Sequence, residues 1–102
     1  MIRHTVVFRL RHAESSPEEA DFLRTAREQL TQIPGVERFE VLRQTGVQSS
    51  YRHSLSMEFA DAAAYAAYNV HPRHTAFVQG RWIPEVEEFL ELDFEPYGGG
   101  AA

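Results

Sequence analysis

The amino-acid sequence predicts an α+β fold in which helices pack on one face of a four-stranded antiparallel sheet. Two periodicities indicate it. Apolar and polar residues alternate over residues 2–10 and 51–59, which is typical of half-buried strands. Between these segments apolar residues recur at three- and four-residue spacing, which is typical of an amphipathic helix.

The first half of the chain predicts a strand, a helix and a second strand. One face of the first strand carries Ile2, His4, Val6, Phe8 and Leu10. Ser16 and Pro17, followed by two glutamates, predict a helix start, because an N-cap oxygen and acidic groups favour the free amides there. Pro34 and Gly35 end the helical region, and residues 36–42 predict the next strand.

The second half of the chain repeats the pattern as strand, helix and strand. The predicted elements are a strand over 51–59, a helix over 62–68 capped by Asp61, a helix from Pro72 to about Trp82, and a strand over 89–94. The complete order, strand–helix–strand–strand–helix–strand, is the ferredoxin-like β-α-β-β-α-β arrangement.

Composition limits the chemistry open to this chain. Its 102 residues suffice for one domain, which we expect to span 1–97, followed by a disordered glycine-rich tail at 98–102. The chain has neither cysteine nor lysine, which excludes disulfides, thiolate nucleophiles and lysine Schiff bases. A net charge of −5 without a basic block disfavours nucleic acid and membrane surfaces as partners. The N-terminal segment lacks a signal-peptide pattern, so we expect a cytoplasmic protein.

A sheet with helices on one face leaves its other face uncovered. That face mixes apolar, hydroxyl and charged side chains, and it includes Arg3, Thr5, Val7, Ser54 and Ser56. Such a face can pack against a second copy of itself, with arginines pairing with acids across the contact. We therefore expect a homodimer.

The segment Tyr68–His74 concentrates proton-transfer groups. It places a phenol and two imidazoles around Pro72, at which a helix can restart. Imidazole changes charge near neutral pH, and both groups serve as acids or bases in enzymes. The structural alternative is that His71 caps the turn and His74 packs as an ordinary helix residue.

Several motifs resemble those of the stress-responsive A/B barrel (Dabb) family of dimeric ferredoxin-like proteins. The pieces that carry the resemblance are Ile2–Phe8, Ile33–Val36, Tyr51–His53, Phe59–Asp61, Tyr68–His74 and Asp93–Glu95. They run through nearly the whole chain, and their order and spacing match the family. The resemblance implies a dimeric α/β barrel.

One member of that family is a plant polyketide cyclase that makes olivetolic acid, and the resemblance to its motifs implies roles for four residues. His74 would be the general base and Tyr68 its hydrogen-bonding partner or oxyanion donor. His4 and His53 would line the pocket, and strand alternation independently places both on apolar faces. The expected pocket walls are Phe8, Phe22, Leu23 and Met57.

Three functions stay open at this point. The first is a cofactor-free cyclase or isomerase that moves a proton on a small carbonyl compound. The second is a non-catalytic stress-responsive or ligand-binding protein that holds a small hydrophobic ligand in an apolar pocket. The third is a cofactor-free oxygenase, which belongs to the same broad architecture. Gly46 and Gly80 stand alone and form no phosphate-binding loop, so no cofactor is expected.

The resemblance also implies a magnesium-type ion at the end of the first helix, held by the main-chain carbonyls of Leu30, Ile33 and Val36. The last carbonyls of a helix lack partners within it and carry the negative end of its dipole. Carbonyls alone bind magnesium weakly compared with carboxylates, so we expect a weakly bound ion. His71 and His74 form a poorer metal pair, because no carboxylate within the segment supplies a third ligand.

Overall fold

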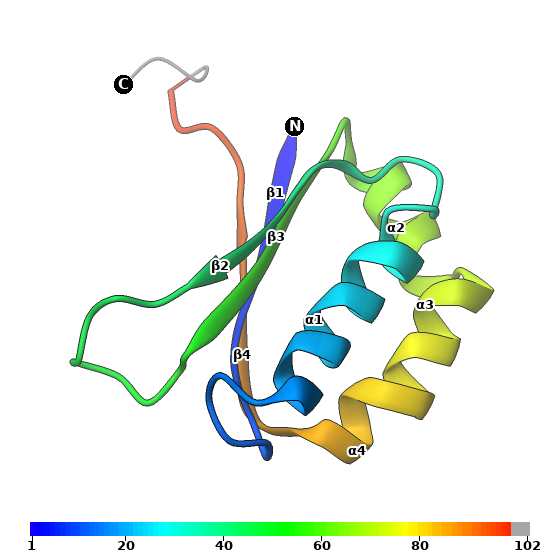
Figure 1. Ribbon diagram of the computed structural model, residues 1–102. Helices are drawn as coiled ribbons and strands as arrows, with labels where there is room; N and C mark the ends of the chain where they lie inside the picture. The colour runs from blue at the N-terminus through cyan, green and yellow to red at the C-terminus, as the bar shows by residue number, and fades with distance from the viewer. Residues whose placement is uncertain (99–102) are drawn as a thin grey trace.

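The computed structural model describes residues 1–98, so the predicted disordered tail lies outside the described residues apart from Gly98. The elements in chain order are β1 (Ile2–Leu10), α1 (Pro17–Leu30), β2 (Glu37–Arg43), β3 (His53–Phe59), α2 (Ala62–Val70), α3 (Pro72–Phe77), η1 (Val78–Trp82), α4 (Ile83–Glu85) and β4 (Val86–Phe94). The helices lie on one side of the sheet (Figure 1), and the predicted ferredoxin-like α+β fold is confirmed.

The sheet is antiparallel, with the strand order β2-β3-β1-β4. Because β1 lies between β3 and β4, its residues Arg3–Phe8 have a paired neighbour on both sides. His4 lies opposite Met57 on β3 and Asp93 on β4. Phe8, four residues further along, lies opposite His53. His4 and His53 therefore share the face that the helices cover but stand at different ends of it.

Local hydrogen bonds explain where the helices begin. Ser16 accepts from the Glu19 amide at 3.1 Å, and Asp61 accepts from the Ala64 amide at 2.8 Å, as predicted for N-caps. His71 separates α2 from α3, with an extended backbone and a side chain that accepts from the Arg73 amide. Pro72 suits the first position of α3, because an amide hydrogen there would lack a helical partner.

The junction of the last helix and the last strand differs from the prediction. β4 begins at Val86, three residues earlier than expected, since Val86 is buried and the Arg11 amide donates to the Glu85 carbonyl at 2.8 Å. The predicted helix over 72–82 is α3 followed by the π-helical turn η1, in which the Ile83 amide donates to the Val78 carbonyl. Pro84 lies inside the short α4.

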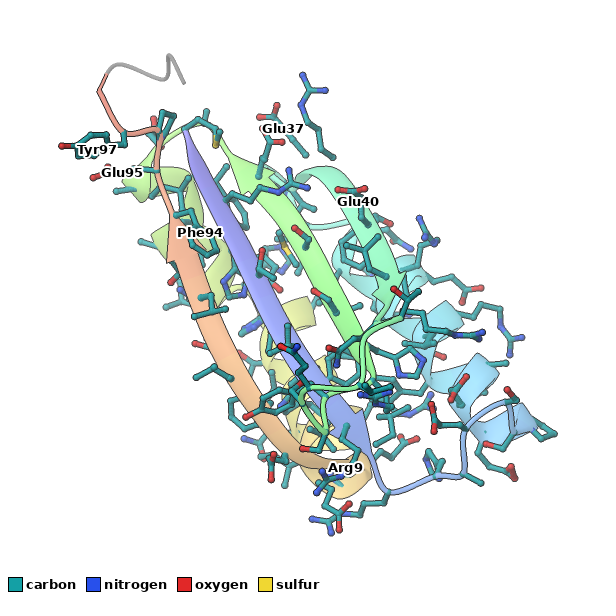
Figure 2. All side chains as sticks on the ribbon, turned by 90° about the vertical axis from the view of Figure 1, so that its left-hand side faces the viewer. Arg9, Glu37, Glu40, Phe94, Glu95 and Tyr97 are labelled. Carbon is teal, nitrogen blue, oxygen red and sulfur yellow. The ribbon has the colours of Figure 1, made fainter. Side chains whose placement is uncertain are left out.

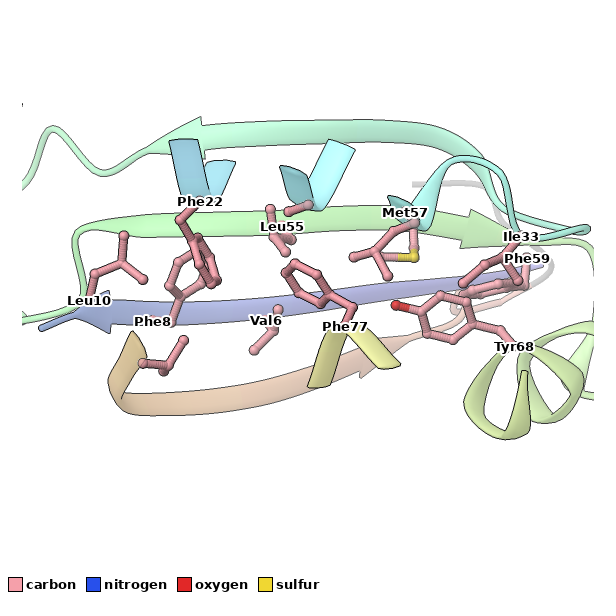
Figure 3. Close-up of a cluster of buried hydrophobic side chains, with 13 residues drawn as sticks. Val6, Phe8, Leu10, Phe22, Ile33, Leu55, Met57, Phe59, Tyr68 and Phe77 are labelled. Atoms are coloured by element: carbon pink, nitrogen blue, oxygen red, sulfur yellow. The ribbon is translucent and has the colours of Figure 1, made fainter. Parts of the chain in front are cut away.

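A continuous apolar core fills the space between the sheet and the helices (Figure 3). Its largest fully buried side chains are Phe8, Phe22, Phe59, Leu55 and Met57. Phe22 of α1 packs against Phe8 of β1 and Phe77 of α3, with ring centroids 5.9 and 5.6 Å apart. This aromatic cluster fixes α3 above the sheet, and it thereby positions the residues that α3 carries.

The opposite sheet face is open and combines apolar side chains with ion pairs (Figure 2). Its exposed large apolar residues are Leu42, Leu90, Leu92 and Phe94. Arg3 pairs with Glu40 and Glu58, and Arg9 pairs with Glu87 and Glu88. Among the described residues, no helix is long and apolar enough to cross a membrane.

Candidate functional site

A cavity of about 350 Å³ lies between the sheet and the helices α3, η1 and α4. Its size is at the small end of the range for small-molecule sites. The apolar lining consists of Val6, Leu30, Leu55, Met57, Phe77, Val78, Trp82, Ile83 and Phe89. The polar lining consists of His4, Tyr68, His74 and Glu91. Ile83, Phe89 and Glu91 are exposed, so the cavity reaches solvent beside α4 and β4.

Tyr68 projects from α2 into the core and is 2% exposed. Within residues 1–98 no group forms a hydrogen bond with its hydroxyl, so the hydroxyl is free to donate to a ligand in the cavity. Burial raises the pKa of the phenol, and the nearby Tyr65 and Glu91 add to the rise. The hydroxyl therefore keeps its proton at any physiological pH.

His74 lies on the first turn of α3, with its ring centroid 4.5 Å from that of Tyr68. Its Nδ1 lies 3.2 Å from the Asn69 carbonyl oxygen, which can only accept, so Nδ1 carries a proton. In the neutral ring, Nε2 then holds a lone pair. Burial lowers the pKa of His74, although the bond to Asn69 opposes this. His74 is therefore mainly neutral at neutral pH, as a general base must be.

His4 enters the cavity from β1 and is held by two residues from other elements. Its Nδ1 lies 2.6 Å from Asp93 Oδ1 on β4. The Tyr65 hydroxyl of α2 donates to Asp93 Oδ2 at 3.0 Å, and its oxygen lies 2.9 Å from His4 Nδ1. Burial, together with the bond to Asp93, raises the pKa of Tyr65 to about 12. The carboxylate accepts from both neighbours, so it fixes the orientation of the imidazole.

This arrangement can perform proton transfer. It offers a neutral imidazole beside a protonated phenol, inside an apolar cavity where polar contacts are stronger than in water. A second imidazole, His4, completes the polar end of the cavity.

Comparison with known protein families identifies the family of this chain. Residues 2–96 match the model of the stress responsive A/B barrel domain. The chain belongs to the Dabb family. No curated protein matches it in sequence.

Solved structures extend the comparison. A Dabb protein with a ferredoxin-like fold from Mesorhizobium loti is 57% identical, with a TM-score of 0.94 over 95% of this chain and 97% of that chain. A dimeric ferredoxin-like protein of unknown function from Thermobifida fusca is 19% identical, with a TM-score of 0.74 over 91% and 88%. A hydroxynitrile lyase from Passiflora edulis is 15% identical, with a TM-score of 0.79 over 91% and 90%. The last two share the fold alone.

Three of the four expected site residues of this Dabb protein lie at one cavity, and His53 does not. His53 is buried near Glu19 at the other end of the sheet, with Nε2 3.6 Å from Glu19 Oε1. The expectation that His4, His53, Tyr68 and His74 converge is therefore wrong for His53. The reason is register, because β1 places Phe8 rather than His4 opposite His53.

Of the expected pocket walls, one residue lines the cavity and three do not. Met57 lines the cavity. Phe8 and Phe22 are fully buried in the aromatic core, and Leu23 packs at the edge of that core. The cavity is instead closed by apolar residues of α3, η1 and α4 that the sequence did not single out, namely Phe77, Val78, Trp82 and Ile83.

Asp93, Tyr65 and Glu91 were missed as parts of the polar site. Asp93 and Glu91 alternate on the predicted last strand, which was a usable signal, because alternate residues share a face. Tyr65 is three residues before Tyr68 on α2, so both point to the same side of that helix.

The carbonyls implied as cation ligands sit where the chain leaves α1. The Leu30 carbonyl accepts from the Ile33 amide at 3.2 Å, and the Ile33 carbonyl accepts from the Val36 amide at 3.3 Å. Each oxygen keeps a second lone pair, but the donor set is neutral, so these residues fit only a weakly held hard cation. Within residues 1–98, no group of three or more His, Cys, Asp or Glu side chains is arranged to hold a metal.

Proposed function

We propose that this Dabb protein is a cofactor-free cyclase or isomerase that transfers a proton on a small carbonyl compound. The observation that carries the proposal is the pairing of His74 and Tyr68 at one cavity. His74 presents a lone pair on Nε2, and Tyr68 presents a hydroxyl that no group within residues 1–98 engages.

In the proposed reaction, His74 Nε2 removes a proton from the carbon next to the carbonyl. The electrons of the broken C–H bond move to the carbonyl oxygen, and Tyr68 donates a hydrogen bond to the resulting enolate. In an isomerase, the imidazolium returns the proton to a different carbon. In a cyclase, the enolate carbon attacks a second carbonyl of the same molecule, whose oxygen then takes up the proton.

The comparisons support this proposal at the level of fold. A hydroxynitrile lyase from Passiflora edulis has the same architecture, so the fold can carry an enzyme. The non-catalytic alternative uses the same cavity, and it differs in one measurable respect, because a binding protein holds a ketone without exchanging its protons.

Exchange of α-protons in D₂O, followed by NMR on a panel of apolar ketones, tests the proposal without a known substrate. We expect exchange with the wild-type protein and a loss of about a hundred- to ten-thousand-fold in His74→Ala. Tyr68→Phe should lose nearly as much, and both variants should stay folded. His12→Ala, outside the cavity, is the control. Binding without exchange would support the non-catalytic alternative, and exchange unchanged in His74→Ala would overturn the role of His74 as the base. Oxygen consumption would instead identify an oxygenase.

We also infer that the protein is a homodimer joined through the open sheet face. That face exposes Leu92 (39%), Leu90 (47%) and Phe94 (55%) beside arginine–glutamate pairs, which suits a self-complementary contact. Three matched ferredoxin-like structures, from Thermobifida fusca, Bacteroides fragilis and Jannaschia, are described as dimeric.

Light scattering at micromolar concentration tests the homodimer. The wild-type protein should have twice the mass of one chain. Leu92→Arg should give a monomer, because it places an unpaired charge at the centre of the contact. Val70→Arg is the matched control, since Val70 is an exposed apolar residue of α2. A monomeric wild-type protein would defeat the inference.

A further inference from the structure

Glu91 is a carboxylate at the edge of an apolar cavity. It lies on β4 opposite Val6 of β1, and so on the sheet face that the helices cover. It lines the cavity and is exposed. The other acids of β4 all have partners. Glu87 and Glu88 form ion pairs with Arg9, and Asp93 accepts hydrogen bonds from His4 and Tyr65. Among residues 1–98, nothing forms a hydrogen bond or an ion pair with the Glu91 carboxylate.

No positive charge in the cavity offsets Glu91. The thirteen lining residues include no arginine, and the chain has no lysine. His4 is paired with the Asp93 carboxylate, which cancels any positive charge it carries. His74 donates to a neutral carbonyl. A ligand in this cavity therefore meets a field of one sign.

We propose that Glu91 sets the charge selectivity of this cavity, so that it accepts apolar molecules with a cationic or neutral polar group and discriminates against carboxylates. This inference rests on the proposed function, which places the ligand in this cavity, and it adds the charge class of the ligand. Acids and acyl thioesters of phosphate-bearing carriers fall outside that class, and neutral ketones and amines fall inside it.

The size of the effect follows from the exposure of Glu91. A charge that solvent partly screens changes the affinity for a charged ligand by a factor of about two to five. The apolar part of the ligand contributes equally in each case, because Phe77, Trp82 and Phe89 contact it whatever its head group. A series with one skeleton and three head groups therefore isolates the contribution of the charge.

Trp82 makes the measurement direct, because it is the single tryptophan of the chain and lines the cavity. The probes are phenylpropylamine, benzylacetone and hydrocinnamate, which share a phenyl tail and carry a cationic, a neutral and an anionic head near neutral pH. Binding is followed by Trp82 fluorescence and by calorimetry. We expect affinity to decrease in that order, with neighbouring probes differing about two- to fivefold at low salt.

The decisive variant is Glu91→Gln, which keeps the shape of the side chain and removes its charge. It should tighten hydrocinnamate and weaken phenylpropylamine about two- to fivefold each, and leave benzylacetone unchanged. Glu95→Gln changes the net charge equally from outside the cavity lining, and it should preserve the wild-type order. Equal affinities for the three probes, an order that Glu91→Gln leaves intact, or no binding of any probe would overturn the inference. The predicted order without α-proton exchange would support it and overturn the proposed reaction instead.

Discussion

The two ends of the inner sheet face each bury a histidine, but they use it differently. At one end, His4 is oriented by Asp93 and shares a 350 Å³ cavity with His74. At the other end, His53 is just as buried, yet it faces Glu19 of α1 at 3.6 Å, and its Nδ1 has no partner among the described residues. Both histidines are 5% exposed. Burial alone therefore does not distinguish a site from a structural contact.

The partners make the difference. Glu19 is occupied in holding the start of α1, because its Oε2 accepts from the Ser15 amide at 3.1 Å while its own amide donates to Ser16. The bond to Ser16 satisfies an amide that the helix start leaves free, and the bond from Ser15 fixes the residue before the N-cap. At the first end, Tyr68 and His74 face the 350 Å³ cavity, whereas His53 lines a separate cavity of about 270 Å³ with Glu19, Arg9 and Arg52. We therefore expect the His53 end to serve mainly stability and the His74 end to serve the proposed chemistry.

The largest expected effect that separates the two ends comes from Glu19→Ala. It removes the bond to the Ser15 amide and the carboxylate beside His53, which should lower the free energy of unfolding by about 1–3 kcal/mol. Urea denaturation measures the loss, and α-proton exchange should be unaffected. Glu18→Ala, on the same helical turn but exposed, should cost only about 0.5 kcal/mol. Loss of exchange at full stability would contradict this division of roles.

A second prediction concerns pH, and it tests whether the two ends titrate alike. Burial lowers the pKa of both His53 and His74. Histidine in the unfolded chain has a pKa of about 6.5, so below about that pH the unfolded chain binds more protons than the folded protein does. The free energy of unfolding should therefore fall as the pH drops from about 6.5 toward the lower pKa values of the folded protein.

Each histidine can contribute a slope of at most about 1.4 kcal/mol per pH unit. Urea titrations between about pH 6.5 and 5 measure it, above the range in which the lowered pKa values of Asp21 and Glu85 matter. His53→Gln and His74→Gln should each flatten the slope. A slope that neither variant changes would show that these imidazoles are not the groups that titrate.

The smallest effect is expected from a hard cation at the end of α1 nearer the cavity, where Leu30 contributes to its lining. Magnesium on the carbonyls of Leu30, Ile33 and Val36 should raise stability only weakly, by about 0.4 kcal/mol at a concentration equal to its Kd. Thermal unfolding with magnesium and with a chelator measures the difference. Histidine NMR signals should not shift, and a shift at His71 or His74 would place the metal on imidazole instead.

The fold could be predicted from the sequence because its signals are local. Alternation over 2–10 and the caps at Ser16 and Asp61 each depend on neighbours within a few residues. The start of β4 was misplaced because Val86 follows a proline-containing turn whose helical geometry depends on packing. The π-helical turn has no local sequence signal of that kind.

The site was predicted less completely, because it depends on pairing between distant strands. Tyr68 and His74 lie in one segment, so their proximity is nearly local. The contact of His4 with Asp93 spans 89 residues and follows from the β1–β4 register. The separation of His53 from His4 follows from the β1–β3 register in the same way. Alternation assigns a residue to a face but not to a position along it.

The turn η1 ties the shape of the cavity to the length of the chain. Val78, Trp82 and Ile83 all line the cavity, and they do so across a turn that holds one residue more than an α-helix does. Deleting one residue there, such as Gly80, whose missing Cβ would meet nothing within 4 Å beyond its own helix, would let the turn close as an ordinary α-helical turn and would shift the lining residues within it. Tyr68 and His74 precede the turn and would keep their places. In this architecture, evolution can change the ligand by insertion or deletion while the proton-transfer pair remains as it is.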